Sequence, residues 1–127
     1  MKIITRSLNT YLASIAVFVS FLFLGPIAFG EDAVIADPEH YTVVFENDRV
    51  RVIRITYGPG EKSVMHGHNA GVIIDITDTE FRMTFPDGTA EDSTSAAGTI
   101  VWDDGSEHLP ENLTDEPAEV IYVEIKD

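Results

Sequence analysis

Cysteine is absent from the 127-residue chain. Its absence excludes disulfide bonds, thiolate metal sites, cysteine nucleophiles and a lipid-modified N-terminal cysteine. Secretion remains compatible with the sequence, because disulfides are common outside the cytosol but are not required there. Any metal site in this chain therefore has no sulfur ligand from cysteine.

Basic residues are scarce. Eight Lys and Arg stand against twenty-two Asp and Glu, which gives a net charge of −14. Lys2 and Arg6 lie in the first six residues, whereas every acidic residue lies at Glu31 or later. Without that N-terminal segment the chain carries six basic and twenty-two acidic side chains, a net charge of −16. Such a surface repels a phosphate backbone and an anionic membrane, so nucleic acid is excluded as a partner.

The first thirty residues have the order of a secretory signal peptide. Lys2 and Arg6 form a short positive region, and residues 11–24 form a continuous run of apolar and small residues. Gly25-Pro26 then ends the helical pattern, and Ala28-Phe29-Gly30 places small residues at the −3 and −1 positions of a cleavage site. We expect an exported protein, located in the periplasm or outside the cell.

An uncleaved membrane anchor is the alternative for this segment. Residues 7–30 carry no charge and are numerous enough to span a bilayer. With cleavage, the chain divides into a signal peptide at 1–30, a short N-terminal segment at 31–39 and one barrel domain at 40–127. Membrane contact is then expected only through the signal segment.

Long stretches of helical periodicity are missing after His40. Short runs of β-branched and aromatic residues occur instead, separated by turn residues such as Asn, Asp, Gly and Pro. This pattern predicts an all-β fold, an antiparallel β-barrel or jelly roll. The expected strands are 41–45, 50–57, 63–68, 72–76, 81–85, 91–95, 99–102 and 120–125.

The expected strand at 50–57 has an irregular pattern. Val50 and Val52 share one face, while apolar residues from Ile53 onward occupy the other face. A β-bulge near Val52 and Ile53 explains the switch, and so does a strand buried on both faces. The second explanation makes one outer face a dimer surface, and the pattern does not choose between the two.

The spacing of the histidines is the strongest indication of a functional site in the sequence. His66 and His68 are two residues apart on an expected strand, so both imidazoles project from the same face, within reach of one ion. His108 follows forty residues later, just after a strand end. A His-x-His pair alone is weak evidence, because such a pair is common on protein surfaces. The spacing of nearby glycines strengthens it.

Two motifs in the chain resemble those of the cupin superfamily of small antiparallel β-barrels. The first cupin motif runs Gly, five residues, His-x-His, then Glu and Gly, and residues 60–68 match its first half. The second motif runs Gly, Pro-x-Gly, His and Asn. Gly98, Gly105, His108 and Asn112 match it, with one residue fewer after Gly98. The resemblance extends over about residues 41–125.

The resemblance implies a divalent metal bound by His66, His68 and His108. Val72 stands where the motif has its metal-binding Glu, so the usual set of three histidines and one glutamate lacks its carboxylate. Three neutral imidazoles leave the ion its full charge and open positions for water or substrate. Imidazole ligands suit iron, zinc, manganese, copper and nickel, and the sequence does not choose among them. Thiol dioxygenases with three-histidine iron are cupins of this kind, whereas other cupins have lost their metal.

The sequence also predicts a location or a role for several residues other than the three histidines. Tyr57 is the one catalytic candidate near the histidines, as a general acid or base, and Arg54 is expected outside the barrel. Trp102 is expected in the core and His40 at an exposed strand start. Asp103 and Asp104 are expected in a solvated turn, and Asn112-Leu113-Thr114 matches a glycosylation acceptor, although the cupin motif explains Asn112 better.

Taken together, the sequence predicts an exported small cupin barrel that binds a divalent metal through three histidines. A metal-dependent oxygenase or isomerase acting on a small polar molecule is one outcome. A non-catalytic binder of metal or a small ligand is another, and a metal-free barrel with an assembly role is the third. The sequence leaves open whether the protein is an enzyme, and the resemblance makes a homodimer a candidate assembly.

Overall fold

The computed structural model describes residues 30–127, so the expected signal segment lies almost entirely outside the described residues. The described part contains one short helix and nine strands, and none of its helices is long and apolar enough to cross a membrane. The elements are α1 (Ala33–Ala36), β1 (Tyr41–Glu46), β2 (Val50–Tyr57), β3 (His66–Gly67), β4 (Gly71–Asp75), β5 (Thr79–Thr84), β6 (Ala90–Ser95), β7 (Ile100–Asp103), β8 (Glu107–Asn112) and β9 (Ala118–Ile125).

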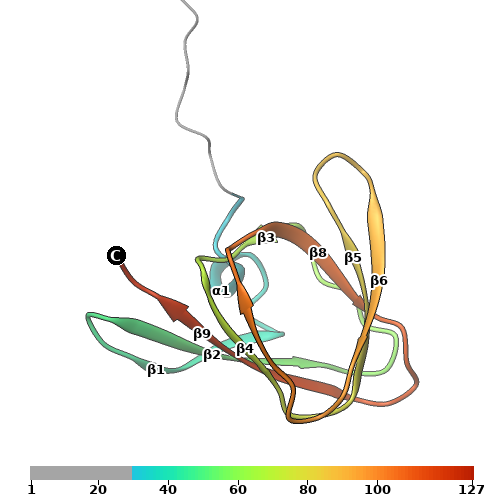
Figure 1. The fold of residues 1–127 in the computed structure, drawn as a ribbon. Helices are drawn as coiled ribbons and strands as arrows, with labels where there is room; N and C mark the ends of the chain where they lie inside the picture. Colours follow the sequence, from blue (N-terminus) through green and yellow to red (C-terminus); the bar gives the residue numbers. More distant parts are fainter. Residues whose placement is uncertain (1–29) are drawn as a thin grey trace, which may run out of the picture.

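The strands form two antiparallel sheets that face each other (Figure 1). One sheet has five strands in the order β1-β2-β9-β4-β7, and the other has four in the order β3-β8-β5-β6. The helix α1 packs against β1 and β3. This arrangement confirms the predicted all-β antiparallel fold of the jelly-roll type.

The core follows from the alternation of side chains along β2 and β9. Ile53, Ile55 and Tyr57 of β2 are buried, while the intervening Arg54 is exposed and forms an ion pair with Glu119, with 2.8 Å between Arg54 Nε and Glu119 Oε1. On β9 every second residue from Ala118 is buried. Because β2 and β9 are paired neighbours in one sheet, both sets project from the same face of that sheet into the space between the two sheets, and the barrel has an apolar and aromatic interior.

The irregularity expected near Val52 is a β-bulge, but the extra residue lies in the neighbouring strand. Val43 pairs with Ile53 and Phe45 pairs with Val52, so Val44 of β1 is the inserted residue. The strand β2 itself pairs with β9 without interruption from Val50 to Tyr57. Within the single chain the valines on its outer face are partly buried.

One strand was not predicted. β8 is a full member of the four-stranded sheet and pairs with both β3 and β5. Its inward positions hold His108, Pro110 and Asn112, and its outward positions are partly exposed. Because polar residues and proline occupy the buried face, the strand lacks the apolar alternation by which a strand is recognised.

The prediction that Trp102 lies in the core is wrong. Its side chain is 58% exposed, and its Nε1 donates a hydrogen bond to Asp104 Oδ1 at 2.8 Å. The reason is the pleat of β7, the edge strand of its sheet: Val101 lines the interior, so the next residue points outward. Trp102 therefore does not contribute to an interior site.

Candidate metal centre

The three predicted ligand residues come together in the structure. His66 and His108 face each other directly in the β3–β8 pair, and His68 follows the end of β3. All three residues are buried, with exposed fractions of 0%, 6% and 9% for His66, His68 and His108. Their candidate ligand nitrogens lie within 4.8 Å of one another. The arrangement could hold a metal ion.

The hydrogen bonds of the imidazole rings leave the same nitrogen free on each ring. His66 Nδ1 lies 2.8 Å from Val64 O, His68 Nδ1 lies 3.0 Å from Glu124 Oε1, and His108 Nδ1 lies 3.0 Å from Ser106 Oγ. A carbonyl and a carboxylate only accept hydrogen bonds, so the Nδ1 atoms of His66 and His68 carry the protons. The Nε2 atoms of His66 and His68 then present lone pairs, as metal ligands must, and the Ser106 hydroxyl, which is able to accept a hydrogen bond, permits the same tautomer at His108.

His66 Nε2 is the clearest sign that the cluster lacks a partner. Among the described residues it is the one fully buried side-chain nitrogen or oxygen without a hydrogen bond. Buried polar atoms in folded proteins almost always have a partner, because an unsatisfied one costs about 1–3 kcal/mol. A divalent ion bound between the three rings would satisfy this nitrogen, so the residues present fit a metal.

The ionisation of the cluster also suits metal binding. Burial, together with the nearby His68, lowers the pKa of His66 to about 4. Burial, followed by the proximity of His68 and His66, lowers the pKa of His108 to about 3. At neutral pH both rings are therefore neutral and keep their lone pairs.

A chain of charged groups, which the sequence analysis missed, orients His68. Glu124 of β9 is fully buried; its Oε1 accepts a hydrogen bond from His68 Nδ1, and its Oε2 accepts one from Arg51 Nε at 2.7 Å. Arg51 also forms an ion pair with Asp32, whose Oδ1 caps the first turn of α1 by accepting from Val34 N at 3.0 Å. The alternation of buried residues along β9 could have indicated that Glu124 is buried, since it lies two residues after the buried Tyr122. Carboxylates in this position fix the tautomer and orientation of metal-binding histidines.

The residue expected to match the motif carboxylate, Val72, does not face the histidines. Val72 does not line the interior; Ile73 does, on the same face as its partners Tyr122 and Val101. The reason is again the pleat, which sends adjacent residues of β4 to opposite faces. Neither residue is a carboxylate, so the cluster within residues 30–127 consists of the three histidines.

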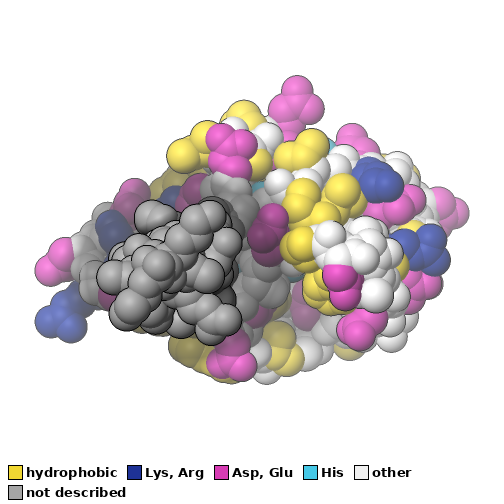
Figure 2. Space-filling view, turned by 90° about the horizontal axis from the view of Figure 1, so that it is seen from above, with side chains coloured by type: hydrophobic (Ala, Val, Ile, Leu, Met, Phe, Trp, Pro, Cys, Tyr) yellow, Lys and Arg dark blue, Asp and Glu magenta, His cyan; other side chains and the backbone are white. Residues whose placement is uncertain are grey.

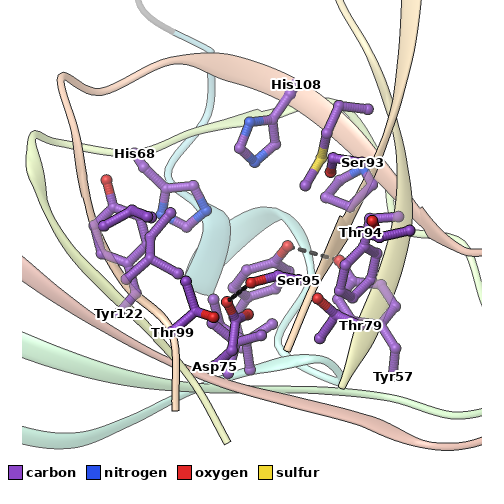
Figure 3. A pocket seen from close by; sticks show the side chains of 18 residues that line it. Tyr57, His68, Asp75, Thr79, Ser93, Thr94, Ser95, Thr99, His108 and Tyr122 are labelled. Carbon is purple, nitrogen blue, oxygen red and sulfur yellow. Dashed lines mark hydrogen bonds between the residues drawn. The ribbon is translucent and has the colours of Figure 1, made fainter. Parts of the chain in front are cut away.

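A cavity of about 390 Å³ opens beside the histidines, between the two sheets. His68 and His108 line one end of it, and Figure 3 shows both rings pointing into the space. Most of the remaining wall is apolar or aromatic, and Tyr41, Ile55, Phe81, Met83 and Val120 belong to it. Cavities of this size and lining suit small organic molecules.

Tyr57 lines the cavity, but Tyr41 is the phenol that packs against the histidines. The ring centroid of Tyr41 lies 4.6 Å from that of His66 and 5.5 Å from that of His68. Tyr57 is joined to it through a 2.6 Å hydrogen bond between the two hydroxyls (Figure 3). Burial raises the pKa of Tyr57 to about 12 and raises that of Tyr41 well above its ordinary value. Both phenols are therefore protonated at neutral pH and suit proton donation rather than base catalysis.

The prediction that His40 is exposed is wrong. Its ring stacks on Tyr57 with centroids 4.4 Å apart, and its side chain is 13% exposed. Its Nδ1 lies 2.7 Å from Asp37 Oδ2, and its Nε2 lies 2.9 Å from Glu61 Oε2. Carboxylates from the end of α1 and from the loop after β2 converge on the start of β1, and they hold the ring in place. His40 is not part of the metal cluster.

The remaining candidates have structural roles. Asn112 is fully buried, and its Nδ2 donates to Gly58 O at 3.0 Å and to Glu116 O at 2.8 Å. These hydrogen bonds join two loops, which explains the place of Asn112 in the motif. They also leave the amide nitrogen without a free position for a glycan. Asp103 Oδ1 accepts from Gly105 N at 2.8 Å, and Asp104 accepts from Trp102, so both stabilise the turn.

Solved structures similar to this chain are cupins. A cupin domain from Bordetella pertussis is 27% identical, has a TM-score of 0.64, and is matched over 68% of this chain and 92% of its own. An RmlC-like cupin family protein with a double-stranded β-helix fold, from Methanocaldococcus jannaschii, is 19% identical, with a TM-score of 0.54 and coverage of 68% and 78%. An oxalate decarboxylase structure is 20% identical, with a TM-score of 0.52, and this chain covers 26% of it. No protein-family model and no curated protein matches the sequence. The described chain has the cupin fold.

Proposed function

We propose that this cupin-fold protein binds one divalent transition metal through the Nε2 atoms of His66, His68 and His108. The observation that carries the proposal is the common orientation of the rings, with each Nδ1 held by a neighbour and the buried Nε2 of His66 left without a partner. Iron, zinc, manganese, copper and nickel are all compatible with three imidazoles.

The residues around the cluster prepare it for an ion and a small ligand. Glu124 holds the proton on His68 Nδ1, which keeps the other nitrogen of that ring free. Tyr41 and Tyr122 both pack against the His68 ring, with ring centroids 5.5 Å and 4.7 Å away. When bound, the ion supplies Lewis acidity, or redox chemistry in the case of iron, manganese or copper. A small molecule in the cavity would reach it from the side of His68 and His108.

A metal-dependent oxygenase or isomerase acting on a small polar molecule is the activity that this arrangement supports. The cavity has a mainly apolar and aromatic wall and holds two protonated phenols, one of which contacts the histidine rings. These phenols are able to donate a proton or a hydrogen bond to a bound substrate. A binder of metal or small ligand without turnover, and a metal-free assembly barrel, are the competing outcomes of the tests below.

Metal content of the full chain, purified without a histidine tag and reconstituted with each candidate ion, tests the metal site. We expect about one equivalent of metal per chain in the wild type. In His66→Ala and His108→Ala we expect roughly a tenth of an equivalent or less, because each variant keeps only two of the three histidine ligands. His40→Gln is the matched control, since this histidine lies outside the cluster. Less than roughly a tenth of an equivalent in the wild type for every ion would disprove the proposal.

Turnover is tested separately on protein that holds metal. Dioxygen consumption and product formation with small thiols, diketones and sugars would distinguish an oxygenase or isomerase from a binding protein. Conversion lost in His108→Ala but kept in His40→Gln would support catalysis at the cluster. Binding of a panel compound without conversion would support the binder.

Export of the protein is also proposed. It is supported by the order of charged, apolar and small residues within 1–30. N-terminal sequencing of protein recovered from the periplasm or medium should begin near Glu31. Recovery of the chain beginning at Met1 in the membrane fraction would support the anchor instead.

A further inference from the structure

Asp75 is an acidic side chain with no basic partner at the wall of the cavity. It ends β4, lines the cavity and is 6% exposed. Its Oδ2 accepts a hydrogen bond from Ser95 Oγ at 2.6 Å, a neutral group. Across residues 30–127 no Lys, Arg or His lies within ion-pair distance of it.

The position of Asp75 places it away from the histidines. Gly71, at the other end of β4, pairs with Glu124, the partner of His68, whereas Asp75 pairs with Val120. Four residues of strand separate the two points, about 13 Å at the usual rise per residue. Figure 3 shows Asp75 and Ser95 on the side of the cavity opposite His68 and His108.

The wall between these two ends is suited to an apolar or cationic group. Ile55 and Val120 supply aliphatic surface, and Tyr57, Phe81 and Tyr122 supply aromatic rings. Aromatic faces attract cations as well as alkyl chains. Asp75 is the one carboxylate among the described lining residues, which include no Lys or Arg.

A carboxylate has room for more than the single hydrogen bond that Ser95 supplies, because its two oxygens offer about four acceptor positions. A buried carboxylate without a cation is costly, and a ligand that carries a cation removes that cost. We infer that the cavity recognises a small organic cation, a primary amine whose ammonium group binds Asp75 while its carbon chain extends toward the histidines. This inference rests on the proposed function in one respect: it names the class of substrate for the same site.

The test compares three probes of nearly the same shape and different charge: n-butylamine, butan-1-ol and butyrate. At pH 7 the amine is an ammonium ion, like the side chain of lysine, and the acid is a carboxylate. Binding to the full chain, stripped of metal, is followed by calorimetry and by NMR in a buffer without amines. We expect the amine to bind roughly tenfold more tightly than the alcohol, because a charge-assisted hydrogen bond is stronger than a neutral one. Butyrate should bind most weakly.

Variants separate the charge from the structure around it. Asp75→Asn keeps an acceptor for Ser95 and should reduce the affinity for butylamine to that for butan-1-ol. Ser95→Ala keeps the carboxylate and should retain the preference. Asp48→Asn, at an exposed acid outside the cavity, removes the same charge from the surface and should also retain it.

Equal affinity of the wild type for the amine and the alcohol would overturn the inference, and this result needs no variant to fold. A preference that survives Asp75→Asn would overturn it too. Because the protein is free of metal in these measurements, amine recognition and metal binding fail independently. Metal binding without the amine preference would refute this inference alone, and the preference without metal binding would refute the proposed function alone.

Discussion

Hydrogen bonds and ion pairs connect several side chains around the histidines. Glu124 joins the His68 ring to Arg51, and Arg51 in turn contacts Asp32 beside α1. All four groups are at least partly buried, so the interactions between them are weakly screened by solvent. The orientation of His68, one of the proposed metal ligands, therefore depends on residues at both ends of the described chain.

Glu124→Gln should weaken metal binding about 10–100-fold, the usual cost of changing the carboxylate that supports a histidine ligand. The amide keeps the size of the side chain but removes the charge that favours the protonated His68 Nδ1 and pairs with Arg51. Competition with a chelator measures the affinity. Glu119→Gln, on the same strand but outside the barrel, is the matched control, and equal affinities in the two variants would contradict the role of Glu124.

His40 should make the stability depend on pH near neutrality. Burial opposes its charged form, but the hydrogen bonds to Asp37 and Glu61 outweigh this and raise its pKa above 6.5. A raised pKa contributes stability that is fully present below about pH 6.5 and is lost as the pH rises through the folded value. The wild type should lose no more than about 1 kcal/mol between pH 5.5 and 8.5 through this group, since the pair with Glu61 is half exposed.

Urea denaturation at both pH values checks this expectation. The difference in unfolding free energy between wild type and His40→Gln should shrink as the pH rises. A constant difference would mean that the charge of His40 contributes nothing, and that its stacking on Tyr57 accounts for its whole effect.

At the scale of the strands, β9 leaves no room for a side chain at Gly71 of β4. A Cβ at this residue would lie 2.3 Å from Val123 O and 2.7 Å from the Tyr122 ring. Gly71→Ala should therefore destabilise the protein by about 1–3 kcal/mol, because backbone and a buried ring would have to move. At Gly58 the nearest atoms belong to the half-exposed side chain of Glu61 and not to backbone or a buried ring, so Gly58→Ala is the milder control. Similar denaturation midpoints for both variants would refute this account.

How much of this fold was predictable from sequence depends on what each strand buries. The strands β2 and β9 bury aliphatic and aromatic residues in alternation, and β2 was predicted with its observed limits. The convergence of the three histidines followed from the motif resemblance. The strand β8 was missed because its buried face holds polar residues and a proline. Trp102 was misplaced because three consecutive apolar residues at the start of β7 show no alternation from which the inward face is identified.

At the scale of the whole molecule, acidic side chains spread over the visible surface with few basic ones among them (Figure 2). Residues 31–127 carry a net charge of −16, and the histidine cluster lies buried beneath this surface. A field of this sign attracts divalent cations toward the barrel and raises their rate of association. The attraction acts over the surface and not within the buried cluster.

Metal association should therefore slow several-fold as the ionic strength rises from about 0.01 M to 0.15 M, since the screening length falls from about 30 Å to 8 Å. Dissociation from the buried cluster should change little. Stopped-flow measurement of Zn²⁺ or Co²⁺ uptake at several salt concentrations separates the two rates. An association rate that is independent of salt would show that the surface charge has no part in metal capture.

The unsatisfied nitrogen of His66 has a consequence for how the protein resists unfolding. A buried polar group without a hydrogen-bond partner raises the free energy of the folded state, and this cost disappears when a ligand binds there. Ligands that bind only the folded chain raise its stability with the logarithm of their concentration. Under the proposed metal binding, the metal-free barrel is the form most easily unfolded and degraded, and the supply of metal would set how long each molecule survives.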